Sequence, residues 1–348
     1  MGVKMYNNQR LYWIDIAKGA LLFLVILGHL VTYNSYAFAF IFAFHMPAFF
    51  FLSGYTLNVK NTKFALFLKK KCCSLLIPYL VFGAVAFCLS LLVPPTKTLE
   101  DIVTKTTLEN FFWYGQPSHG AGATWFLISL FCAQILVYVL VHINKKWISI
   151  TVTVVSGVLG MYVKEILWHF ESIKLPWNIS ITLVAFPFVI FGYYFKEKKL
   201  LQVYQESDNH LLTYVIFLIS LSMIFVFGCD LNSPVNMGSL TYGNPIYYWI
   251  GAFWGIIMII SFSLILKRNK FLEFYGRNSL IIFALQAYVY NFLIYIVNKI
   301  FETDYIKMKN IPNVLCFILA IITFLIWGLI VKIINGIKNR LVKICRNI

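Results

Sequence analysis

The sequence predicts an all-α membrane protein: a bundle of about ten transmembrane helices with both termini in the cytoplasm. Hydrophobic residues make up 60% of the 348 residues and charged residues only 12%, whereas soluble domains carry about 25% charged residues. Ten apolar runs approach or exceed the roughly 20 residues that a bilayer requires. These runs are 11–33, 36–58, 74–93, 122–142, 147–163, 177–195, 211–228, 245–266, 280–298 and 313–335. No repeat or linker divides them, so residues 1–348 are expected to form one integral-membrane domain.

The distribution of lysine and arginine predicts the orientation. With the N-terminus placed inside, 21 of the 29 basic residues fall in cytoplasmic segments and seven in outer segments, while Lys18 lies within the first helix. Basic residues are enriched in the cytoplasmic loops of membrane proteins, so this placement explains a net charge of +16 without nucleic acid. No small-residue cleavage site follows the first apolar run, which is therefore expected to remain as a helix.

The first apolar run carries three ionisable residues. The stretch from Arg10 to Val31 contains Asp15, Lys18 and His29, and a charge inside a bilayer marks a functional site by default. Lys18 and His29 differ by about 20° around a helix and Asp15 and His29 by about 40°, so all three share one face. Lys18 and His29 are roughly 16 Å apart along the axis. The alternative is an interfacial Asp15–Lys18 pair, with His29 bonding a neighbouring helix.

The second apolar run adds a histidine at the same end of the bundle. Residues 38–57 contain His45, Pro47 and Ser53. The turn before them is short, so His29 and His45 are expected in the outward halves of neighbouring helices. The proline frees a backbone carbonyl that needs another partner, and Ser53 with the glycine after it permits close helix approach. His45 is expected either to contact substrate or to be a structural partner.

Basic residues at predicted inner ends of helices are candidates for binding a phosphorylated donor. Lys69 and Lys70 belong to a basic run that sets topology, binds anionic lipid or holds the phosphates of a nucleotide-bearing donor. Arg277 lies beside a predicted helix N-terminus, where an anion site would form. A helix cap with a topology charge explains the same arginine equally well.

Two predicted outer loops are candidates for binding an acceptor. The longer one, 94–121, contains His119 and leads directly into Trp125, whose ring would either stack on a sugar or belong to the interfacial aromatic belt. The polar segment 229–244 would either frame an acceptor entrance or be a turn. The seven cysteines show no metal or redox spacing, and neither a disulfide framework nor a metal site is predicted.

Five short motifs occur in the order found in a known family. They are D-x-x-K-G at 15–19 followed by His29 after ten intervening residues, FHMPAFFFLSGY at 44–55, IPY at 77–79, WFL at 125–127 and GRNSL at 276–280. With these motifs the chain resembles the multi-pass acyltransferase family 3 over most of its length. Many members carry arginine at the position of Lys18. Gln286 is a departure, because relatives often have histidine there, and no role of that histidine is transferred.

The resemblance implies O-acylation, usually O-acetylation, of envelope or extracellular glycans in a bacterial inner membrane. Acetyl-CoA, supplied from the cytoplasm, would be the acyl donor. The acceptor would be a glycan or a lipid-linked sugar, and membrane lipid would surround the protein. Lys18 and His29 match the functional positions of the family.

The residues themselves are suited to acyl transfer. Transfer to a hydroxyl needs a base and donors for the oxyanion, and His29 is the best base because its unperturbed pKa of about 6.5 lies near working pH. Asp15 is roughly 21 Å from His29 along the axis, so Asp15 is expected to pair with Lys18 instead. Direct transfer is favoured, with an acyl-histidine or acyl-serine step left open.

Three groups of site residues follow from this reading. The expected catalytic residues are His29, Lys18 and Asp15; the donor-binding residues are Lys18, Lys69, Lys70 and Arg277; the acceptor-binding residues are His45, Ser53, Trp125 and His119. The competing class is a transporter or flippase for a glycan or lipid-linked sugar, which ten helices with intramembrane charges also suit. No repeated pair of broken helices supports it.

Overall fold

Ten helices in the described part of the chain are long and apolar enough to cross a membrane, which confirms the predicted helical bundle. The computed structural model describes residues 11–33, 35–92, 109–115, 122–169, 175–201, 210–301 and 312–346. The spanning helices are α1 (Tyr12–Leu30), α2 (Tyr36–Tyr55), α3–η1–α4 (Phe64–Lys71, Cys72–Leu76, Ile77–Leu92), α6 (Trp125–Ile143), α7 (Lys146–His169), α8 (Ile179–Glu197), α10–η5 (His210–Ile224, Phe225–Asp230), α11 (Pro245–Leu266), α13 (Ser279–Phe301) and α15 (Asn313–Arg346). A further helix, α12 (Lys270–Arg277), is too short to span.

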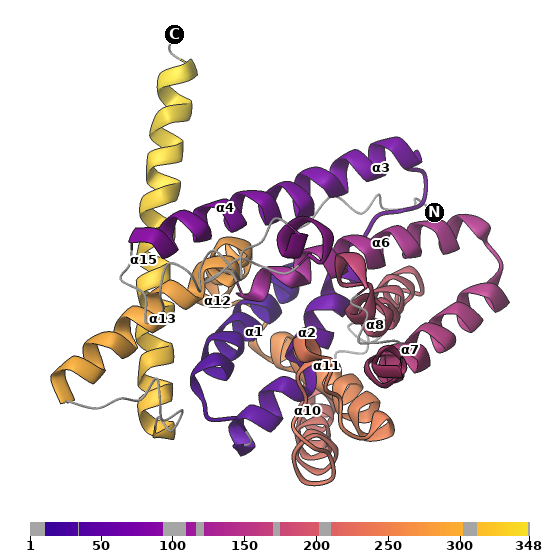
Figure 1. The fold of residues 1–348 in the computed structure, drawn as a ribbon. Coiled ribbons are helices and arrows are strands. Elements are labelled where there is room, and N and C mark those ends of the chain that lie inside the picture. The colour runs from indigo at the N-terminus through magenta and orange to yellow at the C-terminus, as the bar shows by residue number, and fades with distance from the viewer. Residues whose placement is uncertain are drawn as a thin grey trace.

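Helices α1 and α2 lie in the middle of the bundle, and α15 stands at one edge (Figure 1). Helix α2 packs against α1, α8 and α11. It approaches α8 closely because two glycines lie at the crossing: a Cβ on Gly54 would overlap the carbonyl of Val189, and one on Gly192 would overlap that of Phe51. Small residues are the usual means by which membrane helices approach, and the close approach predicted around Gly54 is present.

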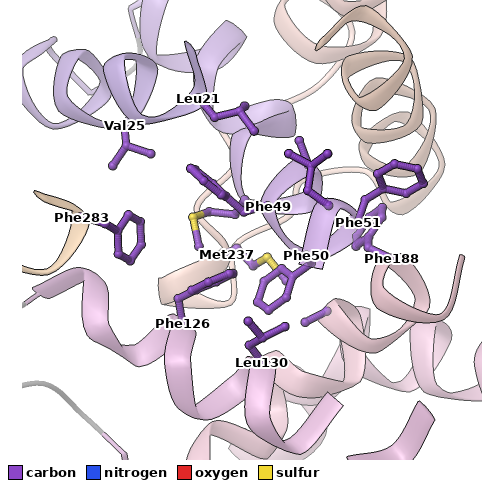
Figure 2. Packing of buried hydrophobic residues seen from close by; sticks show 14 of the residues in the cluster. Leu21, Val25, Phe49, Phe50, Phe51, Phe126, Leu130, Phe188, Met237 and Phe283 are labelled. Carbon is purple, nitrogen blue, oxygen red and sulfur yellow. The ribbon is translucent and has the colours of Figure 1, made fainter. Parts of the chain in front are cut away.

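Three phenylalanines from three helices meet in the core. Phe49 of α2, Phe126 of α6 and Phe283 of α13 have ring centroids 5.6 to 6.1 Å apart and inclined edge to face. Figure 2 shows this cluster beside Leu21 and Val25 of α1. Such aromatic contacts contribute about 0.5–1.5 kcal/mol per pair beyond the burial of area, and they hold α2, α6 and α13 around α1.

The third spanning helix begins about ten residues earlier than predicted. Lys69 and Lys70 were expected in an inner segment before a helix at 74–93, yet both lie in α3, which continues through η1 into α4. Phe67 of α3 is buried, and its ring centroid lies 4.7 Å from that of Tyr138. Lysine is a good helix former, so these lysines lower the hydropathy of the segment without ending the helix.

Helix α12 docks on the start of α1 and on α15. A Cβ on Gly276 would overlap the carbonyl of Asp15, so only glycine allows this approach. The ring of Tyr275 stacks on that of Phe324, with centroids 3.6 Å apart, and the Tyr275 hydroxyl donates a hydrogen bond of 2.8 Å to the Phe324 carbonyl. Burial raises the pKa of Tyr275, so this hydroxyl keeps the proton that it donates.

The segment 231–244 between η5 and α11 is held by the side chain of Asn232. The Asn232 amide donates to the Tyr242 carbonyl at 3.1 Å, and its oxygen accepts from the Asn244 amide at 2.7 Å. Gly243 has φ of +65°, a conformation that side chains rarely adopt, and a Cβ there would also overlap Asn232. This segment was expected either to be a turn or to frame an acceptor entrance. In the structure it is held by hydrogen bonds between its own residues.

Candidate functional site

A cavity of about 430 Å³ lies beside His29 at the end of α1, and we call it the His29 cavity. Its walls come from α1, α2, α13, the start of α6 and the segment 236–238. This volume lies within the range of roughly 300–1,000 Å³ that is typical of small-molecule sites. The polar and aromatic side chains around it include His29, His45, Trp125, Asn236, Tyr290 and Asn291.

His29 occupies the last turn of α1 and is exposed, although the residues on either side of it are buried. Its ring lies parallel to that of Tyr290, with centroids 6.2 Å apart, and edge to face with that of Phe42 at 6.4 Å. Within the described residues no hydrogen bond to its ring is found. The two aromatic rings therefore limit the orientation of the imidazole, and its nitrogens are open to a molecule in the cavity.

His45 faces the same cavity but is buried and fixed. Its Nδ1 lies 2.8 Å from the carbonyl oxygen of Ile41, one helical turn earlier. A carbonyl only accepts, so we assign the proton of neutral His45 to Nδ1, which leaves Nε2 as a hydrogen-bond acceptor. The ring also packs edge to face on Phe42, with centroids 4.8 Å apart. Phe42 thus contacts both histidines and holds them beside one cavity.

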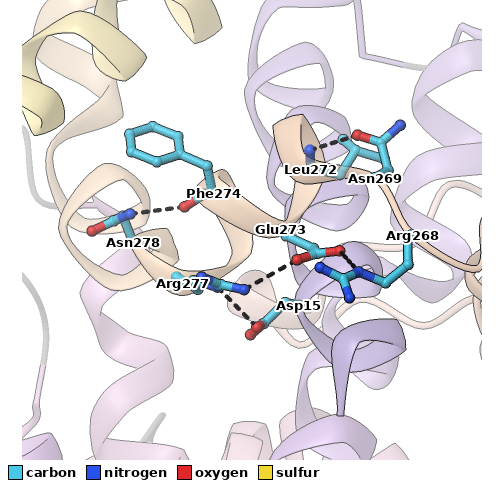
Figure 3. A network of polar contacts seen from close by, with 8 residues as sticks. All are labelled: Asp15, Arg268, Asn269, Leu272, Glu273, Phe274, Arg277 and Asn278. Atoms are coloured by element: carbon cyan, nitrogen blue, oxygen red, sulfur yellow. Dashed lines mark hydrogen bonds and ion pairs between the residues drawn. The ribbon is translucent and has the colours of Figure 1, made fainter. Parts of the chain in front are cut away.

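Four charged residues at the other end of α1 form a network that we call the inner ion cluster. The Arg277 guanidinium donates to the Asp15 carboxylate at 3.3 Å and to the Glu273 carboxylate at 3.0 Å, and Arg268 donates to Glu273 at 2.9 Å (Figure 3). Both carboxylates are buried, whereas the two guanidiniums are 39% and 54% exposed. The cluster therefore buries its negative charges and turns its positive charges toward the surface.

The inner ion cluster adds a distant partner to the surroundings of Asp15. The sequence predicts a partner three residues away, Lys18, and the structure also brings Arg277 of α12 to the Asp15 carboxylate. Lys18 follows one turn later and is half-buried. With Lys18, this end of α1 carries three cations and two carboxylates, and an excess of positive charge favours the binding of an anion.

Packed side chains separate the inner ion cluster from the His29 cavity. Leu21, Leu22 and Ile26 of α1 are completely buried between the two ends. Lys18 and His29 are roughly 16 Å apart along the helix. The structure thus places two chemically different groups of polar side chains at opposite ends of one helix.

The remaining predicted residues fall in different places. Trp125 lines the His29 cavity, and a Cβ on Gly238 would lie 3.3 Å from its indole nitrogen, so segment 236–238 covers this ring. Ser53 is half-buried in the last turn of α2, eight residues beyond His45, and is not among the residues that line the cavity. Lys69 and Lys70 are exposed on α3, away from the cavity. His119 lies outside the described residues.

Sequence reasoning missed three polar residues of the cavity. Asn236 belongs to the segment 229–244, which was predicted either to frame an acceptor entrance or to be a turn, and Tyr290 and Asn291 lie within an apolar run. A signal was available for the last two, because polar residues inside a predicted span are themselves unusual. Gln286, one turn before Tyr290, is buried, and neither polar atom of its amide has a hydrogen-bond partner among the described residues.

The described residues contain no group of three or more His, Cys, Asp or Glu side chains arranged to hold a metal ion. The chemically active groups that the structure does bring together are two imidazoles at one end of α1 and an ion cluster at the other. This arrangement suits proton transfer in the cavity and anion binding at the cluster.

The chain matches a family model and a curated protein. A family model described as an acyltransferase domain matches residues 11–332, nearly the whole chain. Among curated proteins, nodulation protein NolL of Mesorhizobium japonicum is 28% identical over 207 residues, which cover 55% of this chain and 49% of NolL. The match thus spans about half the length of that relative. No solved structure matches the chain.

Proposed function

This chain belongs to the acyltransferase family, and from that premise we propose that it moves an acetyl group from cytoplasmic acetyl-CoA to a hydroxyl of an envelope or extracellular glycan. The observation that carries the proposal is His29, exposed to a cavity of about 430 Å³ with a second histidine beside it. The proposed location is a bacterial inner membrane with both termini in the cytoplasm, as the bias of basic residues favours. The inner ion cluster then lies on the cytoplasmic side, and the His29 cavity opens outward.

In the proposed reaction, His29 acts as the general base. Its ring nitrogen takes the proton of the acceptor hydroxyl as the oxygen attacks the thioester carbonyl. The carbon–sulfur bond then breaks, CoA leaves as thiolate, and the imidazolium returns its proton to the sulfur. The products are an O-acetyl ester and CoA, and His29 is neutral again. The side chains of Asn236 and Asn291 line the cavity and offer N–H donors to the oxyanion.

His45 has a different proposed role, because its Nδ1–H is committed to the Ile41 carbonyl. Its Nε2 accepts a hydrogen bond from a second hydroxyl of the sugar, which orients the ring toward His29. Trp125 offers an aromatic face in the same cavity, against which a sugar ring packs. His45 and Trp125 are therefore proposed acceptor-binding residues.

The donor is proposed to bind at the inner ion cluster. CoA carries phosphates, and guanidinium and ammonium groups are the side chains that recognise them. Arg277 and Lys18 offer such groups beside α1, and the exposed Lys69 and Lys70 of α3 would add to the attraction or contact lipid headgroups. Asp15 and Glu273 hold Arg277 in place. Asp15 is thus a positioning residue rather than a catalytic one.

The test measures transfer from labelled acetyl-CoA to the envelope glycan in membranes with equal amounts of wild-type protein, His29→Ala or His142→Ala. Loss of a general base predicts a fall of roughly 10²–10⁴-fold for His29→Ala. His142 is a matched control, because it bonds the Tyr138 carbonyl at the other end of α6 and is not among the cavity-lining residues. Full activity of His29→Ala would refute the assignment. Glycan movement across the membrane without acetylation would favour a transporter.

A further inference from the structure

A second cavity of about 420 Å³ lies at the same end of the bundle as the His29 cavity. Ser35 and Tyr36 at the start of α2 line one side of it. Cys229 and Asp230 at the end of η5, together with Asn232, line the other. The proposed reaction uses none of these residues, so the role of this second cavity is open.

Nearby residues of the same two segments line the two cavities. In the first segment, Tyr33 lines the His29 cavity and Ser35 lines the second. In the other, Asn236 lines the His29 cavity and Pro234 lines the second. Two residues of extended chain reach at most about 7 Å, so the cavities are neighbours on both sides. One molecule with two linked units would reach into both.

The segment 232–244, which contributes to the walls of both cavities, is held by its own hydrogen bonds. The side-chain NH₂ of Asn232 donates to the carbonyl of Tyr242, and its side-chain oxygen accepts from the backbone N–H of Asn244. Asn236 and Thr241 form an isolated β-bridge, with both of their backbone hydrogen bonds made. A site that is already formed loses little conformational entropy when it binds a ligand. The segment is therefore suited to separating two binding positions.

The polar groups that remain available in the second cavity are suited to an uncharged sugar. Asp230 is exposed, and its carboxylate, which interacts with the Tyr36 hydroxyl, accepts several hydrogen bonds at once. Tyr36 is 68% exposed and offers both a hydroxyl and an aromatic face. Adjacent hydroxyls of a sugar ring donate to a carboxylate, and the apolar face of the ring packs on an aromatic side chain.

We propose that the second cavity binds the sugar unit next to the one that is acetylated, so that the acceptor is an oligosaccharide or polysaccharide rather than a single sugar. The inference rests on the proposed acetyl transfer and extends it to the length of the acceptor. Asp230 and Tyr36 are its specificity-determining residues. The Asn232 side chain holds the wall and does not contact the sugar.

The first experiment uses Cys229, a free thiol that lines the second cavity. Membranes of the organism that carries this chain are treated with a charged, membrane-impermeant methanethiosulfonate, and acetyl transfer to the envelope glycan is compared before and after labelling. Labelling is expected to lower the activity of the wild type at least about 10-fold. The activity of Cys229→Ser should be the same before and after labelling. Complete labelling of Cys229 without loss, or a Cys229 that does not react, would overturn the second cavity as an open sugar site.

A second measurement separates sugar binding from a structural role. Asp230→Asn keeps the size of the side chain and removes the charge that strengthens its hydrogen bonds. The KM for the polymeric glycan is expected to rise about 10-fold, with kcat and the KM for acetyl-CoA unchanged and no change toward the monosaccharide released from that glycan. An equal rise for the monosaccharide would overturn the proposal. Absence of any transfer by untreated wild type would instead refute the acetyl transfer on which the site rests.

Discussion

Replacing Gly276 by alanine tests whether the docking of α12 positions the donor site. An alanine Cβ would overlap the carbonyl oxygen of Asp15 and would lie 2.7 Å from its carbonyl carbon, whereas ordinary contacts begin at 3.4 Å. Helix α12 must therefore move away from α1 by more than about 0.7 Å. The Arg277–Asp15 pair, at 3.3 Å in the wild type, would then lengthen beyond about 4.0 Å, the limit for an ion pair. Overpacking of this kind costs about 1–3 kcal/mol of stability.

The assay is the KM for acetyl-CoA together with thermal unfolding of the purified protein in detergent. A misplaced Arg277 is expected to raise this KM by about 3–10-fold, the equivalent of about 1 kcal/mol, while kcat changes little because the His29 cavity lies at the other end of α1. Gly336→Ala is the matched control, because nothing lies within 4 Å of a Cβ there. It should be neutral or slightly stabilising. Equal KM and stability in the two variants would refute the reasoning.

Three further variants test the cavity and its surroundings. His45→Phe keeps a ring beside Phe42 but removes the Nε2 acceptor; the KM for the glycan should rise about 10-fold, measured at saturating acetyl-CoA, and an unchanged KM would exclude His45 from acceptor binding. Trp125→Ala removes the aromatic wall and should also raise the glycan KM while CoA binding stays constant, which equilibrium binding of CoA checks. Gln286→Leu replaces a buried amide without partners, so the free energy of unfolding should rise by about 1–3 kcal/mol; a decrease would show that the amide has a partner in the working protein.

The parts of the site on one helix could be predicted from the sequence. A period of 3.6 residues fixes which side chains share a face of a helix. That rule was enough to single out Asp15, Lys18 and His29. His45 followed from the short turn after α1, because neighbouring helices with a short connection are antiparallel. The ten spanning helices could be predicted from ten apolar runs, because the length and hydropathy of a run are local properties of the sequence.

The missed contacts join segments that are distant in sequence. Arg277 reaches Asp15 across 262 residues, and the only local sign of this contact is a glycine before an arginine. Helix α12 has eight residues, too few to register as a span. The hydrogen bonds of Asn232 depend on a positive φ at Gly243, a conformation that composition alone does not specify. Tertiary contacts decide such features, whereas local pattern decides the spans.

The two ends of α1 place different demands on the proposed reaction. The acetyl group must pass from a donor held at the inner ion cluster to a hydroxyl beside His29, roughly 16 Å farther along the helix. Leu21, Leu22 and Ile26 close that route in the structure, and Lys18 lines neither the His29 cavity nor the second cavity. The long, thin arm of CoA would therefore have to part the packing between α1 and its neighbours. Such packing would also limit the passage of water and ions between the two ends of α1.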